Sequence, residues 1–162
     1  MNKLFSKINY KNIAIIIMVA IFFIVDRYLK NLALSQTIES KTALINNIFF
    51  FNFTPNYYMA FSLPFGGRLL TLLTGLIIIT IFIFLIYLIK KSKSKLVIIG
   101  VLLILIGAVS NIYDRLIFGY VIDYLYLINF TVFNIADIFI SAGAILVLIS
   151  TNKKPSNKIP GF

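Results

Sequence analysis

The feature that most constrains this chain is a set of long apolar stretches. Residues 69–89 contain no charged side chain, and three more mostly apolar stretches cover residues 13–34, 96–114 and 133–150. A helix that crosses a bilayer needs roughly 20 mostly apolar residues. The sequence therefore predicts an all-α integral membrane protein with four transmembrane helices.

The composition agrees with a membrane protein. Of the 162 residues, 60% are hydrophobic and only 12% are charged, whereas about 25% of the residues in a soluble domain are charged. The net charge of +10 does not indicate a nucleic-acid-binding module, because too little polar surface is present to cover a soluble globule. We therefore expect no nucleic-acid partner and a single membrane-embedded domain over residues 1–162.

Positive charge is distributed unevenly over the segments that flank the four stretches. Ten lysines and no acidic residue lie before the first stretch, between the second and third, and after the fourth. Positive residues mark the cytoplasmic side of a membrane protein, so both termini are expected in the cytoplasm. The first stretch has Asp26, Arg27 and Lys30 where a signal-peptide cleavage site needs small neutral residues, and we expect it to remain as a helix.

Two segments between the stretches fall on the outer side of this topology. Residues 43–64 are rich in Phe and Tyr and are interrupted by Pro55 and Pro64, which favours short β-strands at the membrane surface over a spanning helix. Residues 116–132 form the second outer loop, and their aromatic side chains suit the level of the lipid headgroups.

The absence of cysteine and histidine limits the chemistry open to the chain. It excludes a disulfide framework, a thiol nucleophile, a Cys/His zinc site and a Ser-His-Asp triad. No cofactor and no metal are expected. Acid–base chemistry must therefore use the acidic residues, which are Asp26, Glu39, Asp114, Asp123 and Asp137.

The rise of a helix places most of these acids at one depth. At about 1.5 Å per residue, Asp26 lies about 20 Å above the cytoplasmic face, Asp114 lies near the outer boundary, and Asp137 lies about 6 Å below the outer face. Asp123 lies in the outer loop between the last two. Because carboxylates inside a membrane are costly, they are functional by default, and the sequence predicts a site in the outer third of the bilayer.

Each acid also has a structural interpretation. Asp26 and Lys30 lie four residues apart on one helical face and can neutralise each other, while Arg27 can reach the headgroups with its long side chain. Asp137 can be a charge that stabilises the start of its helix, and Asp123 can be a solvated loop residue. Two further sets share a helical face and can form hydrogen-bond ladders: Asn111 with Asp114 and Arg115, and Asn134 with Asp137.

Asp123 and Asp137 flank a turn that returns the chain to the membrane, so their carboxylates can meet. Two carboxylates that share one proton provide a base and an acid at once. The ionised one can take a proton from water while the neutral one polarises a peptide carbonyl, which is the chemistry of an aspartic protease. The alternative is a small four-helix transporter with Asp26 as its acidic coupling residue.

Five short motifs occur in order along the chain. They are Asp26-x-x-x-Lys30, Asn56-Tyr57-Tyr58-Met59-Ala60-Phe61, Asn111-Ile112-Tyr113-Asp114-Arg115, Val121-Ile122-Asp123-Tyr124 and Phe133-Asn134-Ile135-Ala136-Asp137. Together they resemble the motifs of the lipoprotein signal peptidase family, also called signal peptidase II. Three positions depart from the family pattern, because Tyr58, Ala108 and Ser110 stand where the family has glycine.

The resemblance implies a bacterial aspartic endopeptidase of the cytoplasmic membrane, with Asp123 and Asp137 as its catalytic pair near the outer face. It would remove signal peptides from prolipoproteins by cutting before the diacylglyceryl-modified cysteine. The residues implied to bind substrate or support the site are Asn56, Asn111, Arg115, Asn134, Asp26, Lys30, Asp114 and Ala136.

The resemblance also implies the shape of the outer segments and the partners. A small β-sheet is expected within residues 43–64, and a short outer helix within residues 116–132. The ring of Tyr58 is expected to lie over the lipid-facing entrance and to contact the substrate. The expected partners are prolipoproteins and membrane lipids, and the chain is expected to be monomeric.

Overall fold

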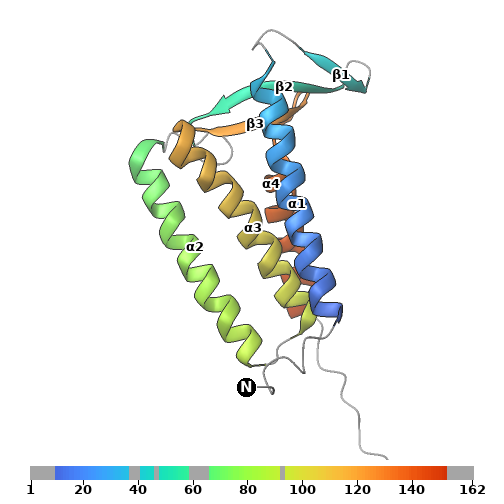
Figure 1. The fold of residues 1–162 in the computed structure, drawn as a ribbon, viewed down its shortest axis with the longest axis vertical. Helices are drawn as coiled ribbons and strands as arrows, with labels where there is room; N and C mark the ends of the chain where they lie inside the picture. The colour runs from blue at the N-terminus through green and yellow to red at the C-terminus, as the bar shows by residue number, and fades with distance from the viewer. Residues whose placement is uncertain (1–9, 37–40, 46–47, 59–65, 92–93, 153–162) are drawn as a thin grey trace, which may run out of the picture.

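The structure, a computed structural model, describes residues 10–36, 41–45, 48–58, 66–91 and 94–152. Within these ranges the chain is mostly helical, with a small antiparallel sheet at one end of the helices (Figure 1). The helices are α1 (Tyr10–Leu34), α2 (Gly67–Lys90), α3 (Lys95–Phe118) and α4 (Ile135–Thr151). The strands are β1 (Thr42–Ile45), β2 (Phe49–Asn56), β3 (Val121–Leu127) and β4 (Thr131–Phe133).

Two helices of the described part, α2 and α3, are long and apolar enough to cross a membrane, and α4 is a shorter apolar helix. The large apolar side chains of α2 are mostly exposed in the isolated chain, as at Leu72, Leu76 and Ile83. A helix satisfies its backbone polar groups internally, so it can present apolar side chains to lipid without an unpaired polar group. The exposed surface of α2 is therefore suited to lipid.

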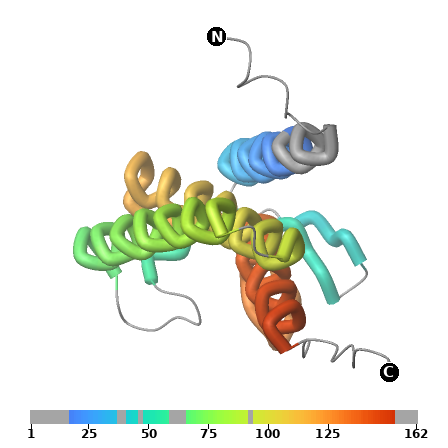
Figure 2. The backbone as a smooth tube through the Cα atoms, turned by 90° about the horizontal axis from the view of Figure 1, so that it is seen from below, coloured from blue at the N-terminus to red at the C-terminus, as the bar shows by residue number. Residues whose placement is uncertain are grey.

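Helix α3 is the centre of the bundle. It contacts α1, α2 and α4, and the view from below shows α1 and α4 on different faces of it (Figure 2). Its contact with α4 is close because small residues face each other there: a methyl group on Gly100 would lie 2.8 Å from the carbonyl oxygen of Gly143, and one on Gly107 would collide with the carbonyl of Ala136. Small residues let helix backbones approach, so this interface fixes α4 against α3.

The sheet contains strands from both segments that were expected on the outer side, residues 43–64 and 116–132, in the order β1-β2-β3-β4. Strands in residues 43–64 confirm that part of the prediction, but the short outer helix expected within residues 116–132 is wrong. Helix α3 continues to Phe118, and Gly119 ends it in a left-handed conformation with φ of 81°, which glycine adopts without steric cost. The β-branched and aromatic residues that follow pair with β2 as strand β3, because β2 offers an edge for pairing and these residue types favour strands.

The end of α1 packs against the sheet. Ala33 of α1, Phe51 of β2, and Ile122 and Tyr124 of β3 form a buried apolar cluster. The rings of Phe51 and Tyr124 lie 5.4 Å apart between their centroids. Asp26, Arg27 and Lys30 of α1 therefore lie just below an apolar layer that joins the helix to the sheet.

Candidate active site

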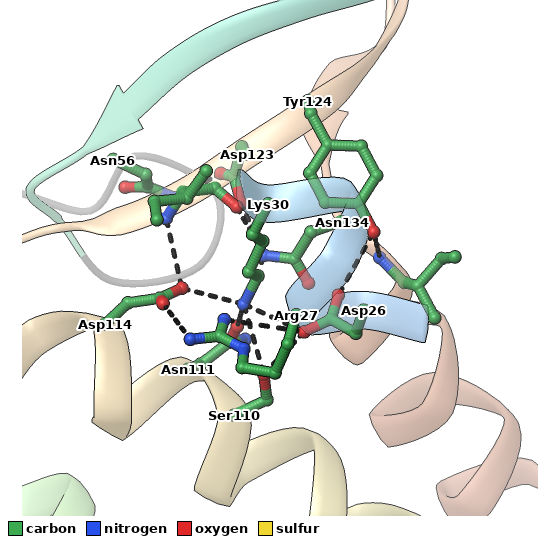
Figure 3. Close-up of polar contacts among 12 residues, drawn as sticks. Asp26, Arg27, Lys30, Asn56, Ser110, Asn111, Asp114, Asp123, Tyr124 and Asn134 are labelled. Carbon is green, nitrogen blue, oxygen red and sulfur yellow. Dashed lines mark hydrogen bonds and ion pairs between the residues drawn. The ribbon is translucent and has the colours of Figure 1, made fainter. Parts of the chain in front are cut away.

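Four charged side chains form a buried ion network between α1 and α3 (Figure 3). The ammonium of Lys30 lies 3.2 Å from Asp26 and 2.7 Å from Asp114, and the guanidinium of Arg27 lies 2.7 Å from Asp114. Asp26, Lys30 and Asp114 are at most 1% exposed. Two positive and two negative charges cancel, which reduces the large cost of burying any one of them. The predicted pairing of Asp26 with Lys30 is confirmed, and Arg27 pairs with Asp114 although it could have reached towards headgroups.

Polar side chains of α3 extend this network. Lys30 donates hydrogen bonds to Asn111 at 2.9 Å and to Ser110 at 3.4 Å, and the Ser110 hydroxyl donates to Asp26. Ser110 is one of the positions where the resembled pattern has glycine. Here its hydroxyl supplies a partner to two buried charges, so the substitution adds a member to the network.

The start of α4 is closed by a capping box. The side chain of Asn134 accepts a hydrogen bond from the N–H of Asp137 at 2.9 Å, and the Asp137 carboxylate accepts one from the N–H of Asn134 at 3.2 Å. Such a box satisfies two N–H groups that a helix start leaves free. The capping interpretation of Asp137 is confirmed, but its second carboxylate oxygen has another partner.

Asn111 and Asn134 join the carboxylates of Asp123 and Asp137. The Asn134 amide donates to Asp123 at 2.6 Å, and the Asn111 amide donates to Asp137 at 2.8 Å. The two amides are also linked, because Asn134 donates to the Asn111 oxygen at 3.2 Å. Strand β3 and helix α4 thus present their carboxylates to one polar cluster, so Asp123 is not a solvated loop residue: it is only 2% exposed.

Asp123 also accepts a hydrogen bond from the segment that contains β2. Asn56, at the end of β2, donates to the Asp123 carboxylate at 2.9 Å, and its own oxygen accepts from the N–H of Tyr58 at 3.1 Å. The guanidinium of Arg115 donates to the carbonyl of Tyr58 at 2.6 Å. The Tyr58 side chain is half exposed, so its backbone is held within the cluster while its ring is free to meet another molecule.

The environment of Asp123 changes its proton affinity. Burial, followed by the nearby charge of Asp137, raises the pKa of Asp123 to about 7, although hydrogen bonds from Asn56 and Asn134 oppose the shift. Burial disfavours the charged form of a carboxyl, and a like charge does the same. Asp123 can therefore hold a proton near neutral pH, as a general acid requires.

Tyr124 links the ion network to α4. Its hydroxyl donates to Asp26 at 3.1 Å and accepts from the backbone N–H of Ile135 at 3.2 Å. Sequence reasoning gave this residue no role in the site, since its partners lie 98 and 11 positions away in the chain and the aromatic side chains of residues 116–132 were expected at the level of the lipid headgroups.

The structure brings nearly all of the predicted residues into one connected cluster. Its members are Asp26, Lys30, Asn56, Asn111, Asp114, Arg115, Asp123, Asn134 and Asp137. Ala136 stands beside this cluster: it is fully buried and makes the close contact with Gly107. Ala108 has no polar side-chain atom with which to join the cluster, and Met59, Ala60 and Phe61 of the second motif lie outside the described residues. Within the described ranges, no group of three or more acidic side chains is placed to hold a metal ion.

Comparison with known proteins identifies the family. The family described as Signal peptidase (SPase) II matches residues 17–153. The chain is 34% identical to the lipoprotein signal peptidase of Caldicellulosiruptor bescii over 77% of this chain and 81% of the relative, and 36% identical to that of Mesorhizobium japonicum over 83% and 85%. With the lipoprotein signal peptidase of Clostridium acetobutylicum it shares 32% identity over 88% and 96%.

Solved structures agree with the sequence relatives. One bacterial membrane enzyme superposes with a TM-score of 0.80 at 26% identity, over 92% of this chain and 93% of that chain. A second bacterial membrane enzyme gives a TM-score of 0.74 at 26% identity, over 88% and 94%. The residues that the family model matches include the whole polar cluster. The sequence relatives are named as lipoprotein signal peptidases, and the two solved structures are described as bacterial membrane enzymes. The chain belongs to the signal peptidase II family.

Proposed function

We propose that this membrane peptidase, which cleaves the signal peptides of lipoproteins, works by aspartic chemistry with Asp123 and Asp137 as its catalytic pair. The observation that carries the proposal is that a strand and a helix bring two carboxylates into one cluster, where Asn134 binds both of them. A pair in such a cluster can share one proton, because two adjacent carboxylates do not ionise together easily. The family and the relatives are peptidases, so the transporter alternative has no support.

The chemistry follows from the shared proton. The ionised carboxylate takes a proton from a water molecule, whose oxygen attacks the carbonyl carbon of the scissile peptide bond. The protonated carboxyl donates a hydrogen bond to the carbonyl oxygen and stabilises the charge that develops there. When the tetrahedral intermediate breaks down, the carboxyl that took the proton from water gives it to the leaving nitrogen and the C–N bond breaks. The pair is then again one ionised carboxylate and one protonated carboxyl.

The surrounding polar residues have positioning roles in this proposal. Asn111 and Asn134 orient the two carboxylates, and Asn56 holds Asp123 from the side of β2. Lys30 and Asp114 hold α1 against α3 beneath the pair. Arg115, which binds the Tyr58 carbonyl, keeps the exposed ring of Tyr58 where the substrate can contact it.

The substrate in this proposal is a prolipoprotein cut on the N-terminal side of its diacylglyceryl-modified cysteine. The lipid of such a precursor lies in the outer leaflet, and its signal helix spans the membrane below, so the scissile bond lies at the outer surface. The sheet end of the helix bundle, where the carboxylates lie (Figure 1), is the part of the molecule that would meet it. We further propose that the chain acts as a monomer.

All four helices cross the bacterial cytoplasmic membrane in this proposal, with both termini in the cytoplasm. Helix α1 contains three charged residues near its outer end, but they are paired inside the protein. Helix α4 has 17 residues, about 26 Å at 1.5 Å per residue, close to the thickness of the hydrocarbon core of about 30 Å. The ten-lysine side then faces the cytoplasm, and the sheet faces outwards.

The test of the mechanism is cleavage of a diacylglyceryl prolipoprotein by purified protein in detergent. Asp123→Asn and Asp137→Asn should each lower the rate by about 10²–10⁴, while the proteins still insert and bind uncut precursor. The double variant should be little slower than either single one, because the two residues act as a unit. A correctly inserted Asp137→Asn protein that cleaves at the parental rate would refute the aspartic mechanism.

The topology has its own test, helped by the absence of native cysteine. A cysteine placed at Thr42 should react with a membrane-impermeant reagent added to intact cells. One placed at Ser94 should react only after the cells are opened. Labelling of Ser94→Cys from outside would reverse the proposed orientation.

A further inference from the structure

The hydroxyl of Tyr124 contacts both an acidic member of the buried ion network and the backbone at the start of α4. It donates to Asp26 of α1 at 3.1 Å and accepts from the N–H of Ile135 at 3.2 Å (Figure 3). The side chain itself is fully buried and belongs to β3. Three elements therefore meet at one oxygen atom.

Ile135 is the first residue of α4, and its N–H is one of those that a helix start leaves without an internal partner. The capping box satisfies the N–H groups of Asn134 and Asp137. The Tyr124 hydroxyl satisfies that of Ile135. Because Ile135 and Asp137 belong to the same first turn, a hydrogen bond to one restrains the position of the other.

The two hydrogen bonds of the hydroxyl reinforce each other. Donation to the Asp26 carboxylate draws the hydroxyl proton away and makes the oxygen a better acceptor for the Ile135 N–H, since neighbouring hydrogen bonds polarise one another. Burial and the charge of Asp26 raise the pKa of Tyr124, so the phenol stays neutral and acts as a bridge. The side chain does not supply protons to the reaction.

We propose that Tyr124 is a positioning residue for the catalytic pair, and that its hydroxyl fixes the first turn of α4, and with it Asp137, relative to the buried ion network. The inference rests on the proposed catalytic role of Asp137. Tyr124 follows Asp123 directly in β3, so one strand carries one catalytic carboxylate and positions the other. A displacement of about 1 Å in a catalytic group can cost two orders of magnitude in rate, so a single buried hydroxyl can matter.

The test is Tyr124→Phe, which keeps the ring and its contact with Phe51 and removes only the oxygen. The loss of a buried hydrogen-bond bridge should lower kcat about tenfold, with KM unchanged because the side chain is buried away from substrate. The matched control is Phe51→Leu, which weakens the packing of the same ring without touching the hydroxyl. It should lower the melting temperature and leave kcat unchanged.

Three outcomes separate the alternatives. A Tyr124→Phe protein with parental kcat overturns the inference, and so does a Phe51→Leu protein that loses as much kcat as Tyr124→Phe. Asp137→Asn, assayed in parallel, distinguishes a failure of the positioning role of Tyr124 from a failure of the aspartic mechanism. If Asp137→Asn cleaves normally, the proposed aspartic mechanism is wrong, whereas an inactive Asp137→Asn beside a fully active Tyr124→Phe removes only the role of the tyrosine.

Discussion

Replacing Lys30 by methionine tests whether the buried ion network holds the bundle together. The Lys30 side chain is fully buried and its ammonium has four partners: Asp26 and Asp114 as ion pairs, and Ser110 and Asn111 as hydrogen-bond acceptors. Methionine keeps much of the apolar volume but removes the charge. The network then has two carboxylates and one guanidinium, a net charge of −1 in a site with almost no exposure to solvent.

The expected cost is set by the uncompensated charge. Removing one partner of a buried ion pair costs about 3–5 kcal/mol, and we expect the free energy of unfolding to fall by that amount. Asp26→Asn should also destabilise the protein, because it leaves a net charge of +1. The double variant returns the network to neutrality. Its decrease in the free energy of unfolding should therefore be smaller, by about 1–3 kcal/mol, than the sum of the decreases in the two single variants.

The measurement is unfolding in mixed micelles of a mild detergent and increasing sodium dodecyl sulfate, followed by circular dichroism. Lys90→Met is the matched control, because Lys90 is exposed in the last turn of α2 and its loss should change the free energy of unfolding by less than about 0.5 kcal/mol. A Lys30→Met protein as stable as this control would refute the reasoning. Strict additivity of Lys30→Met and Asp26→Asn would also contradict it, since the two charges would then not interact.

Three further predictions concern the site. The cleavage rate should fall as pH rises through about 7, where the pair loses the proton that Asp123 holds, and Asn56→Ala should move this fall to higher pH because it removes a hydrogen bond that favours the ionised carboxylate. Gly107→Ala should lower both stability and rate, because its methyl group would push α4 away from α3. Tyr58→Gly should raise KM more than it lowers kcat, since the ring is exposed and its proposed role is substrate contact.

Each of these three predictions has a control variant or an outcome that would contradict it. An alkaline fall at the same pH in Asn56→Ala would show that this hydrogen bond does not act on the titrating group. Gly75→Ala is the control for Gly107→Ala, because a methyl group on Gly75 would meet only Ile112 at an ordinary 3.5 Å, and equal losses in both variants would contradict the packing argument. A Tyr58→Gly protein with unchanged kinetics on several lipopeptides would show that the ring only fills space.

The sequence alone was informative wherever one local property decides the outcome. Apolar stretches of spanning length predict helices without any knowledge of their neighbours, because a chain in lipid must satisfy its backbone internally. The same holds for the pairing of Asp26 with Lys30 and for the charge of Asp137 at the start of α4, since both are decided within a single helical turn. The five short motifs, in their order along the chain, were enough to indicate the family.

Sequence reasoning failed where the outcome depends on a partner far away in the chain. Residues 116–132 were expected to contain a helix, but their strands exist because β2 offers an edge to pair with, and β2 is more than 60 residues earlier. The helix and strand propensities of residues 116–132 contain no information about a strand that lies elsewhere in the chain. For the same reason the sequence did not distinguish a buried Asp123 from a solvated one.

Only the tertiary structure decided which polar side chains form hydrogen bonds with one another. The sequence placed the acids at one depth, but the close packing of Gly107 on Ala136 sets where Asn111 meets Asp137. The roles of Ser110 and Tyr124 as partners of Asp26 arise across the interfaces of α1 with α3 and β3. A hydrogen bond needs its two atoms within about 3 Å, and that is a property of packed elements: the sequence determines which groups need partners, and the fold determines which partners they obtain.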